Sequence, residues 1–150
     1  MTTIIGDWRR KILVSDSQYS DTDSGIKYFH EKVFKVSNGW FCGAGHAGDI
    51  ELVLKYIEGK SRTKPKLKNE NSFLWLKEDG LVACDSKLEW ETCKEYIAIG
   101  SGAMAAEALL RHGTTAEVAI SGACSVDLYS HEPIRIYELG STEGRVYEES

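Results

Sequence analysis

An Asn-Gly pair between two apolar runs is the feature of this sequence that most constrains its fold. The runs are residues 32–36 (KVFKV) and 40–45 (WFCGAG), and Ser37, Asn38 and Gly39 join them. Asn-Gly readily adopts the positive φ angles of a two-residue turn, and apolar runs on both sides favour pairing of the flanking strands. The sequence therefore predicts an antiparallel hairpin here.

Short apolar runs separated by turn residues predict further strands along the chain. These runs cover 2–8, 11–16, 95–100 and 134–139, and residues 72–84 hold two strands that turn at 78–80. A polar stretch at 17–25 lies between the second and third predicted strands. We expect that stretch to be a surface loop.

A helical spacing of apolar residues follows the hairpin. It runs from Ile50 to Ile57 along one face of a helix that is predicted to begin near Asp49 and to end at Gly59. Residues 60–71 are polar and basic, with no apolar periodicity. We expect them to form an exposed connector.

Two more helices are predicted in the second half of the chain. Residues 101–113 are rich in alanine, and Gly113 is placed as a helix stop. Thr114 and Glu117 have the spacing of a capping box at the start of a third helix. Strands, one helix, strands, two helices and a last strand predict an α+β fold of antiparallel sheets with helices packed outside them. We expect a single domain over 1–150.

The composition of the chain excludes several functional classes. The net charge is -5, and no cationic stripe suited to a phosphate backbone is present, so nucleic-acid binding is disfavoured. No apolar run is long enough for a membrane span, and no signal peptide is recognisable. The four cysteines lack C-x-x-C spacing and the four histidines are dispersed. We therefore expect a reduced, cytoplasmic protein with no metal and no cofactor.

The first residues of the chain could take part in chemistry. If Met1 is removed, Thr2 carries a free amine beside its hydroxyl and can serve as both nucleophile and base. A nearby lysine cation would lower the pKa of that amine from its usual value of about 7.7 to 8.0 by like-charge repulsion. Lys32 and Asp16 are candidates for the lysine and for the anion that holds it. Taken singly, each of these residues also has an ordinary structural explanation.

Several motifs, in this order, resemble the bacterial HslV peptidases and the proteasome β subunits, which are N-terminal-nucleophile hydrolases. The motifs are MTTIIG, ILVSDS, EKVFKV, FCGAG, YIAIGSGAMAAEALL and DLYS. The resemblance implies a four-layer α-β-β-α sandwich of antiparallel sheets. It also implies that one outer helix is missing, because the connector at 60–71 stands where the family has a second long helix.

The resemblance assigns catalytic roles to seven residues: Thr2, Asp16, Lys32, Gly43, Ser101, Asp127 and Ser130. In this assignment the threonine hydroxyl attacks a peptide carbonyl, and the lysine, anchored by the first aspartate, tunes the threonine amine. The glycine N–H stabilises the oxyanion, while the two serines and the second aspartate orient the amine and relay protons through water. Phe41, two positions before the glycine, is expected either to shape a pocket or to pack in the core.

The function implied by the resemblance is that of a threonine peptidase. It would degrade unfolded polypeptide inside a homo-oligomeric ring, and an unfolding ATPase of the HslU type is a partner that the sequence leaves open. Two alternatives stay open as well. One is a non-catalytic, proteasome-like structural or regulatory subunit, and the other is a small-molecule amidase that uses the same nucleophile.

Overall fold

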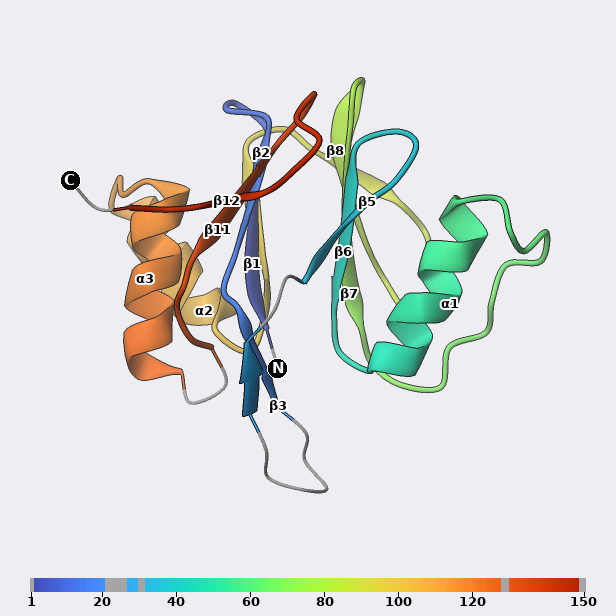
Figure 1. Ribbon diagram of the computed structural model, residues 1–150, viewed down its shortest axis with the longest axis horizontal. Helices are drawn as coiled ribbons and strands as arrows, with labels where there is room; N and C mark the ends of the chain where they lie inside the picture. Colours follow the sequence, from blue (N-terminus) through green and yellow to red (C-terminus); the bar gives the residue numbers. More distant parts are fainter. Residues whose placement is uncertain (1, 21–26, 30–31, 128–129, 149–150) are drawn as a thin grey trace.

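Two antiparallel sheets form the centre of the molecule, and helices cover their outer faces (Figure 1). The computed structural model describes residues 2–20, 27–29, 32–127 and 130–148. The first sheet has the order β10-β1-β2-β11-β12 and the second the order β5-β6-β7-β8-β9. The strands of the first sheet are β1 (Thr3–Asp7), β2 (Ile12–Ser15), β10 (Tyr96–Gly100), β11 (Arg135–Glu138) and β12 (Arg145–Val146). Those of the second are β5 (Val33–Lys35), β6 (Trp40–Ala44), β7 (Ser72–Lys77), β8 (Gly80–Asp85) and β9 (Glu91–Cys93).

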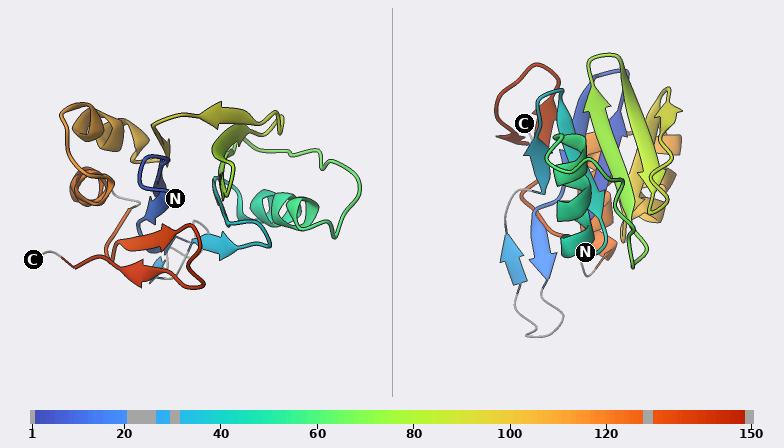
Figure 2. Two further views of the ribbon diagram at one scale, coloured as in Figure 1. Left: turned by 90° about the horizontal axis from the view of Figure 1, so that it is seen from above. Right: turned by 90° about the vertical axis from the view of Figure 1, so that its right-hand side faces the viewer.

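The helices complete the predicted four layers. Helices α2 (Ala103–Arg111) and α3 (Ala116–Val126) pack on the first sheet, and α1 (Ala47–Ile57) packs on the second, as Figure 2 shows from above. Residues 58–71 form no helix and return along the outside to β7. The predicted connector is therefore confirmed, and α1 is the one helix that covers the second sheet within the described chain.

Successive side chains of a strand point to opposite faces of its sheet, and the apolar ones fill three layers. In β1, Ile4 packs between the sheets and Ile5 packs against α2 and α3, and both are fully buried. Between the sheets, the rings of Trp40 and Tyr137 meet with their centroids 5.1 Å apart. Because both faces of each sheet are covered, the central strands are almost wholly apolar.

Phe41, whose role the sequence left open, lies on the outer face of the second sheet. Phe41 is fully buried and stacks on Phe73 at a centroid distance of 5.8 Å. Val53 of α1 closes the same cluster. Phe41 is therefore a core residue.

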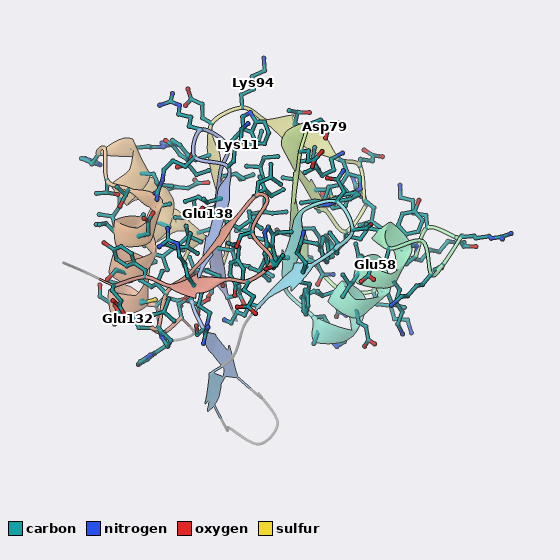
Figure 3. The ribbon with its side chains drawn as sticks, turned by 45° about the horizontal axis from the view of Figure 1, so that its top comes forward. Lys11, Glu58, Asp79, Lys94, Glu132 and Glu138 are labelled. Carbon is teal, nitrogen blue, oxygen red and sulfur yellow. The ribbon has the colours of Figure 1, made fainter. Side chains whose placement is uncertain are left out.

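Many charged side chains lie on the outside of the sandwich. In Figure 3, Lys94 projects away from the sheets and Glu58 lies at the end of α1, and both are exposed. No helix in the described ranges is long and apolar enough to cross a membrane.

The start of α3 corrects one prediction. The predicted capping box at Thr114 is wrong, because Thr115 is the N-cap and its hydroxyl accepts the N–H of Val118 at 3.3 Å. Glu117 instead pairs with the guanidinium of Arg10, so its carboxylate does not close a capping box. The hydroxyl of Thr114 is buried and has no hydrogen-bond partner among the described residues.

Three short strands were not predicted. Part of the expected loop at 17–25 forms β3 (Gln18–Ser20), which pairs with β4 (Lys27–Phe29). The remainder of that loop, from residue 21 onward, lies outside the described residues. Strand β9 extends the second sheet beyond β8. Three-residue strands contain too few alternating positions to give a recognisable pattern.

Candidate active site

Strand register brings three chain segments together at the start of β1. Thr3 lies opposite Gly100 of β10, and Ile4 lies opposite Ser15 at the end of β2. Because both neighbours run antiparallel to β1, the residue after β2 and the turn after β10 meet its first residues. Asp16 therefore lies beside Thr3, and its backbone N–H donates to the Thr3 carbonyl at 3.1 Å.

Asp16 and Lys32 form a buried ion pair that joins the two sheets. The ammonium of Lys32 lies 3.0 Å from each carboxylate oxygen of Asp16, and the two residues are 7% and 0% exposed. The carboxylate also accepts the backbone N–H groups of Thr3 at 3.0 Å and His131 at 3.1 Å. Burial lowers the pKa of Lys32, and the Asp16 carboxylate opposes that shift.

A second polar group lies on the α2 and α3 side of the same strand end. The hydroxyls of Ser101 and Ser130 both donate to one carboxylate oxygen of Asp127, at 2.5 and 2.6 Å. The Thr3 hydroxyl lies 2.5 Å from that of Ser130 and accepts the Gly102 N–H at 3.0 Å. Since the proton of Ser130 goes to the carboxylate, Thr3 donates its own to Ser130.

Thr3 therefore links the two polar groups, although sequence reasoning gave it no role. Its backbone N–H binds Asp16, its side chain binds Ser130, and it is fully buried. Thr2, directly before it, is only half-buried, and its carbonyl accepts the Ser101 N–H at 2.8 Å. Two adjacent threonines thus differ in kind. Thr3 is buried and joins the two polar groups, whereas Thr2 borders a cavity.

A cavity of about 680 Å³ adjoins Thr2. Its walls come from the ends of β1, β6, β7, β8 and β10 and the residues next to them: Thr2, Ala44, Gly45, Glu70, Asn71, Ser72, Asp85, Ser86, Lys87, Gly100 and Ser101. A cavity of this size suits part of an extended peptide or a small ligand.

The two glycines near the end of β6 have different surroundings. Gly43 pairs with Phe73, and a Cβ atom there would lie 2.9 Å from both Phe73 and Ile50 of α1. Gly43 does not border the cavity, whereas Gly45 does. Gly45 has a φ of +139°, which favours glycine. The resemblance assigned the oxyanion role to Gly43 and gave no role to Gly45, the second glycine of the same FCGAG motif.

A thiol near the site is unsuited to nucleophilic attack. Burial raises the pKa of Cys124 to about 12, and the nearby carboxylate of Asp16 acts in the same direction. The thiol therefore stays protonated near neutral pH, and the thiolate is the reactive form. Among the described residues, no group of three histidine, cysteine or acidic side chains is placed to hold a metal ion.

Comparison with known proteins identifies the fold. No family model matches the sequence, and no curated protein matches it either. Among solved structures, the chain is similar to the eukaryotic HslV from Trypanosoma brucei, with a TM-score of 0.71 and 21% sequence identity. The match covers 91% of this chain and 99% of that one. The molecule thus has an HslV-like fold, as the motifs predicted.

Proposed function

We propose that this chain, with its HslV-like fold, is a threonine peptidase in which Thr2 is the nucleophile after removal of Met1. One observation carries the proposal. The Asp16–Lys32 ion pair and the hydroxyl–carboxylate group around Asp127 converge on the first residues of β1, and a cavity opens beside Thr2. Met1 lies outside the described residues, so its removal is part of the proposal.

The proposed reaction uses one residue as both attacker and base. The hydroxyl oxygen of Thr2 adds to a peptide carbonyl carbon, and its proton passes to the free α-amine of the same residue. The C–N bond then breaks, the leaving amine takes that proton, and an ester joins the peptide to Thr2. Water adds to the ester, the C–O bond to Thr2 breaks, and a peptide carboxylate is released.

Lys32 would make the amine a better proton acceptor. A cation close to the α-amine lowers the pKa of that amine by repulsion, so more of it is unprotonated near neutral pH. Asp16 holds the cation in place with two contacts of 3.0 Å. Ser101, Ser130 and Asp127 would orient the amine and pass protons through water.

We assign the oxyanion role to the backbone N–H of Gly45. Gly45 borders the cavity together with Thr2, whereas Gly43 packs against α1. Stabilisation of an oxyanion by one such donor is typically worth about 3 to 4 kcal/mol in other hydrolases. The substrate in this proposal is unfolded polypeptide, and the chain acts in the cytoplasm within a homo-oligomeric ring. An unfolding ATPase of the HslU type stays an open partner.

Substitution of Thr2 tests the proposal. Thr2→Ala should abolish cleavage of an unstructured polypeptide such as casein, and Thr2→Ser should retain measurable cleavage because serine keeps the hydroxyl and the amine. Thermal unfolding should differ little among the three proteins, since Thr2 is only half-buried. Full cleavage by Thr2→Ala, or by protein that retains Met1, would exclude the proposed nucleophile.

A further inference from the structure

Next to Gly45, at the wall of the cavity, lies a polar cluster that the proposed reaction does not use. It consists of Asp49 in the first turn of α1, Asn71 just before β7, and Ser86 just after β8. Asp49 is 5% exposed and Asn71 is 6% exposed. Three separate elements thus direct polar side chains at one point beside the cavity.

Asn71 is the centre of this cluster and uses both ends of its amide. The side-chain oxygen accepts the backbone N–H of His46 at 2.8 Å. The side-chain nitrogen donates to Asp49 at 3.0 Å, to the carbonyl of Asn69 at 3.0 Å and to the hydroxyl of Ser86 at 3.1 Å. Because a carboxylate only accepts, Asp49 fixes which end of the amide faces His46.

The amide of Asn71 lies directly against Gly45. A Cβ atom at Gly45 would lie 2.3 Å from the side-chain oxygen of Asn71, so no larger residue fits there without displacing Asn71. The same oxygen holds the next N–H in the chain, that of His46. The peptide between Gly45 and His46 is therefore held by the side chain of Asn71, a residue that itself borders the cavity.

The hydrogen bonds of Asn71 also favour the charged form of its neighbour. The donated bond from Asn71 lowers the pKa of Asp49, and Asn69 adds to that effect through its side chain and its backbone N–H. Asp49 thus stays ionised near neutral pH and keeps the amide of Asn71 in one orientation. The hydrogen bonds that link these three residues therefore run in one direction: the His46 N–H donates to Asn71, and Asn71 donates to Asp49.

We infer that Asn71 is a positioning residue for the oxyanion donor, and that Asp49 orients Asn71. The inference rests on the proposed function, because it deepens the role given there to Gly45. The Gly45 N–H belongs to the preceding peptide, between Ala44 and Gly45. By packing against Gly45 and binding the N–H of the following peptide, Asn71 restricts rotation of the backbone at Gly45 and so limits the directions that the Gly45 N–H can take. An oxyanion donor that is misaligned contributes little to the transition state.

Asn71→Ala tests the inference, with Asn69→Ala as the matched control. Asn71→Ala should lower kcat by about 10- to 100-fold and leave KM within about threefold, because the donor acts mainly in the transition state. Asn69→Ala removes a side-chain bond to the same carboxylate but nothing that touches His46, so kcat should stay near wild type. An unchanged kcat in folded Asn71→Ala would overturn the inference.

An exchange of the side chains at positions 49 and 71 distinguishes a loss of positioning from a loss of folding. Asn71→Asp alone sets two carboxylates side by side and should lower kcat. The double variant Asp49→Asn with Asn71→Asp restores a donor and an acceptor in reversed order, and it still offers an oxygen to His46. It should recover at least about tenfold of the lost kcat. A double variant that is folded and no more active than Asn71→Asp would contradict the inference.

Hydrogen exchange separates this inference from the proposed function. The His46 amide should exchange at least about tenfold faster in Asn71→Ala than in wild type or in Asn69→Ala. This result does not depend on activity. Equal exchange in all three proteins would overturn the positioning role even if Thr2 is the nucleophile, and an inactive wild type would instead defeat the proposed function.

Discussion

At the residue scale, the ion pair of Lys32 and Asp16 is the most demanding part of the site. Two charges that are almost completely buried carry a large desolvation cost, which close contacts and added hydrogen bonds offset only in part. The backbone N–H groups of Thr3 and His131 supply some of those bonds. Such an arrangement is a poor way to stabilise a core and a common way to tune a reactive group.

The lowered pKa of Lys32 predicts a specific dependence of stability on pH. Burial places that pKa below the unfolded value of 10.5. Between the two values the unfolded chain binds more protons than the folded one, so the contribution of Lys32 to the free energy of unfolding rises with pH. Relative to Lys32→Met, wild type should gain about 1.4 kcal/mol for each unit by which the pKa is lowered.

Chemical denaturation of both proteins from about pH 7 to about pH 10.5 measures this difference. Groups that titrate in both proteins cancel when the two curves are subtracted. A difference that is constant or that falls with rising pH would show that the ammonium is not disfavoured by burial.

Most residues of the candidate site could be predicted from motifs, but their neighbours could not. Asp16 and Lys32 stand out because each follows or precedes a strand pattern in a recognisable order. Thr3 and Asn71 have no such signal, since their roles come from contacts with residues distant in sequence, Ser130 and His46. The choice between Gly43 and Gly45 depends on where β6 ends, and strand ends are poorly determined by apolar alternation.

At the element scale, antiparallel register assembles the site. The end of β2 and the end of β10 flank the start of β1, and α2 and α3 follow on the same side. The sequence predicted these elements well, because the central strands are continuous apolar runs. It missed the short strands β3, β4 and β9 for lack of pattern length.

The start of α3 offers a test at this scale. Thr115→Val should lower the free energy of unfolding by about 0.5 to 1 kcal/mol, because it removes the hydroxyl that accepts the Val118 N–H. Thr114→Val keeps the shape and removes a buried hydroxyl with no partner in the described chain, so it should be neutral or slightly stabilising. Denaturant unfolding of both variants decides between the two caps, and a larger loss in Thr114→Val would contradict the structure.

The failure of the predicted capping box has a plain physical cause. Thr114 and Thr115 are both good N-cap residues, and Glu117 stands three positions after the first of them. In the folded protein, Arg10 from the β1–β2 turn binds Glu117, a contact across more than a hundred residues. Local spacing carries no information about such a partner.

At the scale of the whole molecule, the chain keeps the HslV-like sandwich with only one helix described on the second sheet. The residues after that helix, 58–71, end at Asn71, which holds the wall of the cavity. The connector between α1 and β7 therefore also supplies a contact to the site. The sequence could not predict this contact, because the bond between Asn71 and His46 joins residues that are far apart in the chain.

The central claim is that Thr2 is a free amino-terminal nucleophile, and mass mapping of a covalent adduct tests it most directly. A peptide epoxyketone reacts with both the hydroxyl and the amine of such a residue, so it requires both groups on one residue. We predict a single adduct on wild type, located at Thr2 in protein that lacks Met1, and none on Thr2→Ala. An unmodified wild-type protein, or an adduct on Thr3 or Cys124, would contradict the account.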